Sequence, residues 1–376
     1  MNDPFLDTKN AGLGYKSKVF AGIMSKRAIV GPYLVVIGGS YSCNYRCVFC
    51  EWFSPMREKI NKEILSPNYH LEIDTYERLV KELSRLGTKN ILIDYLEPFM
   101  DSQLIEKIRI AKQQNMGCFI ITNGSLITKE KAEALVNLKL DYLSISINAG
   151  SVETYPKIHL TETPATFERI KAMVTYIEQL KKEQQTIFPH TRLSMVVCNR
   201  NYQDIPKLVE LCHATGVKRA LIKKLISPTK RFAEELELTL PQEAEMKRYL
   251  GEAVKSAAQY GVSLDVEGVE CAGLEKTEGL PCYYGWLFCM IDGNGDVHPC
   301  CFQNQGSSST MGNIKCDDFS KIWFSEKYQD FRKKYKSIEE RRKLGFQCFE
   351  PSCLFNNQQV YKILHEPYLL PLTYWL

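Results

Sequence analysis

Apolar and polar residues alternate along the first two thirds of the chain in a pattern that predicts strands separated by helices. Segments with apolar residues at helical spacing, such as Tyr76, Leu79 and Leu83, lie between short apolar runs. Regular alternation of this kind predicts parallel strands joined by right-handed crossovers. The six predicted strands cover residues 33–37, 90–93, 118–121, 142–147, 192–197 and 217–226.

Several predicted helices begin at residues that commonly cap helices. Asp74, Asp101 and Thr128 stand where helices are expected to start, because their side chains can accept the first free N–H groups. A further helix is expected from Asp204 to Thr215. Beyond the sixth strand, the pattern predicts a linker, then a helix over 241–260 and a short strand over 262–266.

The composition narrows the class of protein. The chain has 376 residues, of which 44% are hydrophobic and 24% charged, and the net charge of +4 is spread along it, which argues against nucleic-acid binding. There is no signal-like start and no apolar run of about 18 residues, so we expect neither secretion nor a membrane span. We expect a cytoplasmic protein, in which clustered cysteines among the 14 are metal ligands.

Three cysteines form the most distinctive motif in the chain. Cys43, Cys47 and Cys50 follow the first predicted strand at C-x3-C-x2-C spacing, with Gly38 and Gly39 before them. Soft thiolates in such a loop select an iron–sulfur cluster or zinc. A structural zinc site takes four ligands, and three thiolates on a four-iron cluster leave one iron open. A zinc knuckle or a set of disulfides is the alternative.

This loop resembles the motif of the radical S-adenosylmethionine (SAM) enzymes, including the aromatic Phe49 before the third cysteine. The resemblance implies a partial (β/α)6 TIM-like barrel with a 4Fe-4S cluster on the three cysteines at the carboxyl ends of the strands. It also implies SAM as a cofactor, with Phe49 packed against the adenine. Reductive cleavage of SAM would then produce a 5′-deoxyadenosyl radical.

The resemblance extends to residues that would bind SAM. Glu97 and Pro98 match the family pattern after the second strand, and Glu97 would accept the amino group of SAM. Residues 95–96 depart from that pattern, in which glycines let the backbone approach closely. The expected contacts with ribose and carboxylate, at the ends of the third and fourth strands, are Asn123, Ser146 and Asn148.

The C-terminal region resembles the SPASM/twitch extension of the same enzymes. The resemblance implies a β-hairpin plus helix that holds an auxiliary 4Fe-4S cluster, with a structural zinc site as the alternative. Cys289 and Cys301 are alternative ligands for the expected set of Cys282, Cys300, Cys348 and Cys353. The expected domains are an N-terminal lead (1–32), the barrel (33–230), a linker helix and strand (231–270) and the auxiliary-cluster domain (271–376).

The other cysteines and the histidines have weaker patterns. Cys118 and Cys212 fit buried core positions. Cys198 follows a strand and Cys271 opens the cysteine-rich region, so either thiol is a candidate catalytic hydrogen donor. We interpret the scattered histidines as loop or surface residues; they are His159, His190, His213 and His298.

The function implied by these motifs is radical chemistry on an unactivated carbon. An auxiliary cluster without an open iron favours oxidation, whereas a thiol hydrogen donor favours epimerisation. We expect a small carbohydrate or aminocyclitol as substrate, and a flavodoxin- or ferredoxin-type protein as electron donor. The alternatives are an enzyme that modifies peptides (a RiPP maturase) and a non-catalytic metal-binding protein.

Overall fold

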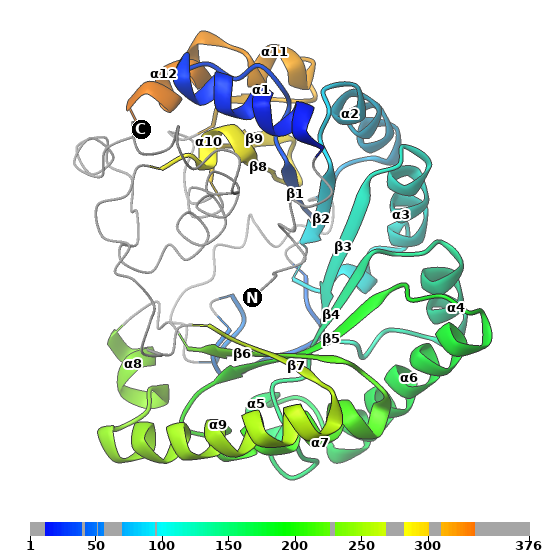
Figure 1. Cartoon of the computed structure of the whole chain (residues 1–376), viewed down its shortest axis with the longest axis vertical. Helices are drawn as coiled ribbons and strands as arrows, with labels where there is room; N and C mark the ends of the chain where they lie inside the picture. Colours follow the sequence, from blue (N-terminus) through cyan, green and yellow to red (C-terminus); the bar gives the residue numbers. More distant parts are fainter. Residues whose placement is uncertain are drawn as a thin grey trace.

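The computed structural model describes residues 12–39, 42–50, 52–55, 70–94, 96–225, 230–267, 282–300 and 310–334. These residues build one ten-stranded sheet with the order β10-β9-β8-β1-β2-β3-β4-β5-β6-β7. In Figure 1 the strands curve in an arc, and helices cover its outer side. The described part of the chain contains no helix with both the length and the apolar character needed to cross a bilayer.

The predicted alternation of strands and helices is confirmed, and β1 to β7 pair in parallel. The strands are β1 (Leu34–Gly38), β2 (Asn90–Asp94), β3 (Gly117–Thr122), β4 (Tyr142–Ser146), β5 (His190–Val197), β6 (Arg219–Lys224) and β7 (Ser263–Glu267). The main helices are α2 (Ile73–Arg85), α3 (Leu104–Gln113), α4 (Lys129–Asn137), α6 (Pro164–Glu183), α7 (Ile205–Thr215) and α9 (Leu240–Tyr260). Shorter helices are η4 (Pro98–Met100), α5 (Tyr155–Ile158), η5 (Tyr202–Asp204) and α8 (Lys230–Leu236).

Local sequence accounts for the start of several helices. The Thr128 side chain accepts the N–H of Lys131 and caps α4, as predicted. Thr239 and Gln242 form a reciprocal capping box at the start of α9. Asp101 lies further from its helix than predicted, because η4 comes first and α3 begins only at Leu104.

The C-terminal hairpin continues the sheet of the barrel. Its strands are β8 (Phe288–Ile291) and β9 (Asp296–His298), and β10 (Gly312–Asn313) adds to β9. β8 pairs in parallel with β1, so that Val36 lies opposite Met290. The helices of this part are α10 (Tyr284–Leu287), α11 (Phe319–Trp323) and α12 (Glu326–Lys334), and α1 (Leu13–Met24) of the lead packs beside α10 (Figure 1).

Alternate side chains of β1 lie in two different cores. Val35 and Ile37 pack in the large core with the outer helices. Leu34 and Val36 face the opposite side, where they join a second core with Phe288 and other aromatic residues of the C-terminal part. Since successive side chains of a strand point to opposite faces, β1 packs against both halves of the chain. The cysteine loop begins directly after this strand.

Candidate functional site

The cysteine loop lies at the carboxyl end of β1. Cys43, Cys47 and Cys50 are partly buried free thiols. The other cysteines among the described residues are free thiols as well, so no disulfide forms there. Burial is the main cause that raises the pKa of Cys43, to about 11, and the charges of Glu97 and Cys50 raise it further. Burial also raises the pKa of Cys47, as do its neighbours Cys50 and Cys43. The three thiols are therefore close enough to influence one another.

Backbone N–H groups of the loop point at two of the sulfur atoms. The N–H of Tyr45 donates to Sγ of Cys43, and the N–H of Phe53 donates to Sγ of Cys50, both over 3.4 Å. Hydrogen bonds of this kind stabilise thiolates and set the potential of iron–sulfur clusters. In the described ranges, no three His, Cys, Asp or Glu side chains have the arrangement that a single metal ion needs. The donor set fits an iron–sulfur cluster, in which each thiolate binds a different iron.

Glu97 is buried beside the loop, with 1% of its surface exposed. Its Oε1 accepts the hydroxyl of Thr122 at 2.7 Å and the N–H of Phe99 at 3.1 Å, and its Oε2 accepts the N–H of Asn123 at 2.8 Å. Burial raises the pKa of this carboxyl, and the three hydrogen bonds oppose that shift. The N–H of Glu97 also donates to the carbonyl of Ser42, which ties this carboxylate to the cysteine loop.

Asn123 joins the end of β3 to the cysteine loop. Its Nδ2 donates to Oδ1 of Asn44 at 2.9 Å and lies 3.9 Å from Sγ of Cys43. Its Oδ1 accepts the backbone N–H and the hydroxyl of Ser125. Asn123, Glu97 and Cys43 therefore form one connected group at the carboxyl ends of β1 to β3.

Asn148 contributes to the structure in a way that the sequence pattern missed. It has a φ of 52°, and its Oδ1 accepts the N–H of Val196 at 2.9 Å while its Nδ2 donates to the carbonyl of Ser146 at 3.2 Å. Both ends of the amide thus connect the end of β4 with β5. Ser146 is partly exposed at the last position of β4, and its role in binding SAM, like that of Asn148, stays a prediction.

Phe49 and Cys198 lie in a small apolar core beneath the loop. This core includes Val48, Ile158 and Phe232, and Phe49 packs against it from a partly exposed position. Cys198 is fully buried there, so the expected opening towards a pocket is not seen, and burial raises the pKa of its thiol. A role for Cys198 as hydrogen donor stays a prediction.

The described part of the expected auxiliary site contains two of its cysteines. Cys282 and Cys300 are partly buried and pack against the same apolar core, next to the hairpin of β8 and β9. Cys289 is fully buried on β8 and packs in the other core. The remaining expected ligands, alternatives and candidate donors lie outside the described residues: Cys271, Cys301, Cys348 and Cys353.

The interpretation of the histidines as loop or surface residues is wrong for two of them. His159 is fully buried, with Nδ1 3.1 Å from Sγ of Cys47. His298 is 4% exposed, and its Nε2 lies 3.1 Å from Oδ2 of Asp292. The sequence carried no periodic signal for these contacts. His159 meets Cys47 across 112 positions of the chain, and His298 meets Asp292 across the hairpin of β8 and β9.

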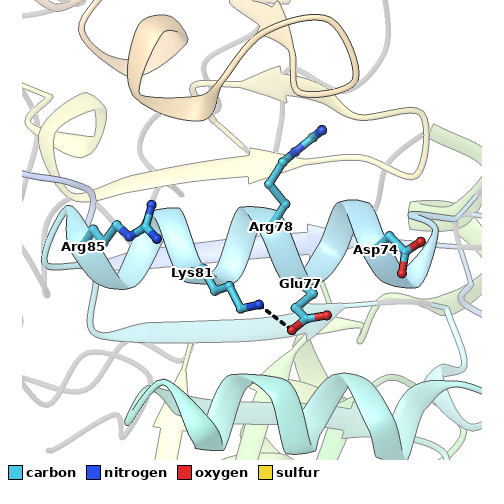
Figure 2. Close-up of a pocket in the computed structure, with 5 residues that line it drawn as sticks. All are labelled: Asp74, Glu77, Arg78, Lys81 and Arg85. Atoms are coloured by element: carbon cyan, nitrogen blue, oxygen red, sulfur yellow. Dashed lines mark ion pairs between the residues drawn. The ribbon is translucent and has the colours of Figure 1, made fainter.

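A separate pocket lies on the outer face of α2, and Figure 2 shows the charged side chains along it. Glu77 and Lys81 form an ion pair across one turn of the helix, while Arg78 extends to the opposite side. Arg78 donates to the carbonyl of Ile314 at 2.8 Å. Because Arg78 contacts Ile314, we interpret this pocket as the seam between α2 and the C-terminal part. Its lining residues all belong to α2 and include none of the residues of the loop site.

Comparisons with known proteins identify two regions. A model of the radical SAM superfamily matches residues 39–212, and a model of an iron-sulfur cluster-binding domain matches residues 282–349. An AdoMet-dependent heme synthase of Methanosarcina barkeri is 25% identical in an alignment of 360 residues that covers 90% of this chain and 96% of that protein. Mycofactocin maturase MftC of Mycolicibacterium smegmatis is 23% identical and covers 82% of this chain and 74% of its own. SuiB of Streptococcus suis, bound to S-adenosylmethionine, has a TM-score of 0.63 at 18% identity, over 89% of this chain and 74% of SuiB.

Proposed function

Because the chain belongs to the radical SAM superfamily and carries an iron–sulfur cluster-binding domain, we propose that it oxidises a peptide or a substrate of similar size. When bound, SAM and the first 4Fe-4S cluster would supply a radical that removes a hydrogen atom from the substrate. The auxiliary 4Fe-4S cluster would accept the electron that the substrate then loses. The proposal depends above all on one observation, the connected group of Cys43, Glu97 and Asn123 at neighbouring strand ends.

The three cysteines of the loop and Glu97 each have a proposed role. Cys43, Cys47 and Cys50 bind three irons of the first cluster, since their free thiols lie on one loop that already offers N–H donors to sulfur. The amino group of SAM would donate a hydrogen bond to Oε2 of Glu97, which in the structure accepts one hydrogen bond, from the N–H of Asn123. The three donors to the carboxylate hold it in a fixed orientation beside the proposed cluster site.

We propose that Cys282 and Cys300 bind the auxiliary cluster together with Cys348 and Cys353. The first two thiols flank a hairpin whose strand β8 pairs with β1, the strand that leads into the cysteine loop. This pairing supports a fixed distance between the two clusters, as electron transfer requires. The matched ranges 39–212 and 282–349 lie on either side of residues 231–270, which supports a division between barrel and auxiliary domain. The expected linker is not separate from the sheet, because β7 within it pairs with β6.

The comparisons favour a peptide-like substrate over the small carbohydrate that the sequence analysis expected. The relatives found by sequence include heme synthases, GTP cyclases and a maturase. None of these names denotes a free sugar or an aminocyclitol. The maturase aligns over 82% of this chain, which favours the peptide-modifying alternative of the sequence analysis. A flavodoxin- or ferredoxin-type donor stays part of the proposal.

Anaerobic reconstitution with iron and sulfide, followed by reduction with dithionite in the presence of SAM, tests the chemistry. We expect 5′-deoxyadenosine and methionine in equal amounts. A reconstituted protein that binds iron yet forms no 5′-deoxyadenosine would contradict the proposed activity.

Deuterium transfer tests the substrate class. A fully deuterated extract of the host organism, separated into peptide and small-polyol fractions, is added to the reduced enzyme with unlabelled SAM. We expect deuterium in 5′-deoxyadenosine with the peptide fraction. Label only with the polyol fraction would restore the carbohydrate hypothesis and reject the peptide one.

A further inference from the structure

His159 lies against the middle cysteine of the loop although 112 residues separate them in sequence. Its ring is fully buried, and Nδ1 is 3.1 Å from Sγ of Cys47. On the other side of the ring, Nε2 is 3.0 Å from the carbonyl oxygen of Ile147. A carbonyl can only accept, so Nε2 carries the hydrogen and Nδ1 of the neutral ring faces the thiol.

Aromatic rings hold the imidazole in this orientation. The ring centroid of Tyr155 is 4.4 Å from that of His159, and the ring of Tyr45 meets it edge-on at 5.1 Å. The hydroxyls of these two tyrosines are hydrogen-bonded to each other over 2.7 Å. The ring of His159 therefore has little freedom to turn away from Cys47.

The three cysteines differ in where their sulfur contacts come from. Cys43 and Cys50 each receive an N–H from the cysteine loop itself, at Tyr45 and Phe53. The side-chain contact of Cys47 comes instead from the segment that follows β4. The side-chain contact of the middle thiol is thus tertiary. Cys43 combines its local N–H donor with Nδ2 of Asn123 at 3.9 Å, and Cys50 has the local N–H of Phe53.

Backbone contacts dock the two segments independently of the imidazole. Cys47 and His159 form an antiparallel bridge. The N–H of Val48 donates to the carbonyl of Ile158 at 2.9 Å, and the N–H of Leu160 donates to the carbonyl of Arg46 at 3.3 Å. A change of the His159 side chain leaves these bonds available, so the contribution of the ring can be tested separately from docking.

We propose that His159 is a positioning residue: its Nδ1 accepts the S–H of Cys47 and so orients the sulfur atom before the thiol loses this proton and binds iron. The inference rests on the proposed role of Cys47 as a cluster ligand. Groups that hold a metal ligand in place typically affect metal affinity by about 10- to 100-fold when they are removed. Both ring nitrogens of His159 already have a partner, Cys47 at Nδ1 and Ile147 at Nε2, which argues against direct ligation of iron by this side chain.

Two substitutions of similar size separate the two ring nitrogens. The amide of His159→Asn reaches the position of Nδ1 and can contact Cys47, whereas that of His159→Gln reaches the position of Nε2 and can contact only Ile147. Each variant is reconstituted anaerobically, and iron release to ferrozine is timed. Melting temperature and the electron paramagnetic resonance spectrum of the reduced cluster are measured on the same samples.

We expect His159→Gln to release iron at least about tenfold faster than wild type, with altered g values. His159→Asn should stay within about threefold of wild type and keep its spectrum, although both variants lose the ring packing and part of the thermal stability. Equal behaviour of the two variants, or the reverse order, would overturn the proposal. Cys47→Ala serves as reference: if it keeps a full cluster, the proposed ligand role fails, which is distinct from failure at His159.

Discussion

The carboxylate of Glu82 on α2 accepts the backbone N–H of Phe319, the first residue of α11, at 2.9 Å. Its other oxygen accepts the N–H of Ser320 at 2.8 Å. Figure 1 shows α11 beside α2 at this point. The first N–H groups of α11 are not capped by the side chain of its own N-cap residue, Asp318. Glu82 of the barrel helix α2 supplies the acceptor instead.

We expect Glu82→Gln to lower the free energy of unfolding by about 1–2 kcal/mol, because hydrogen bonds to a charged acceptor are stronger than those to a neutral amide. Chemical denaturation of the apoprotein measures this change. Glu77→Gln is the matched control on the same helix. It removes an ion pair with Lys81 that is half-exposed to solvent, and such pairs contribute little, so the free energy of unfolding should fall by less than about 0.5 kcal/mol. Equal effects of the two variants would mean that the contact of Glu82 with α11 contributes nothing specific.

Alanine at Cys43, Cys47 or Cys50 should abolish reductive cleavage of SAM while the fold is retained. The three thiols are partly buried in a loop, outside the sheet. The readout is 5′-deoxyadenosine, with circular dichroism as a check on folding. Cys316→Ala removes an exposed thiol and should leave the yield unchanged. Full yield from the triple variant would refute the assignment of the cluster to this loop.

Glu97→Gln should weaken SAM binding by about ten- to a hundredfold, the equivalent of one charge-assisted hydrogen bond of about 1.5–3 kcal/mol. Isothermal titration of the reconstituted protein gives the dissociation constant. Thr122→Val removes a hydrogen bond that Glu97 accepts but keeps the carboxylate. This control should destabilise the fold yet change the dissociation constant by less than about threefold. If both variants weaken SAM binding equally, Glu97 acts only through the structure of the loop.

The chain should hold two clusters, or about eight irons. Removing the triad of Cys43, Cys47 and Cys50 should leave about four irons, those of the auxiliary cluster. Cys282→Ala or Cys300→Ala should lose these irons and keep those of the first cluster. Substrate turnover should stop in the latter variants while uncoupled cleavage of SAM continues. Iron analysis with Mössbauer spectra checks both statements. A triad variant with one zinc and no iron would identify the C-terminal site as structural zinc and remove the electron acceptor.

The order of strands and helices, and the cysteine loop, were predictable from the sequence because their signals are local. Helical spacing on α2, the cap at Thr128 and the separation of Cys43, Cys47 and Cys50 each involve residues a few positions apart. Backbone geometry converts such spacing directly into one helix face or one loop. The strand-end location of Glu97 and Asn123 follows from the same alternation.

Only the tertiary structure decided which distant segments meet. β8 pairs with β1, β7 joins β6, and His159 packs on Cys47 through contacts between residues far apart in sequence. The same applies to Asn148, whose amide connects β4 with β5. A buried polar group needs a partner wherever the fold brings one, and no local period encodes that partner. The sequence alone therefore determined the loop and its three thiols, and the fold determined what surrounds them.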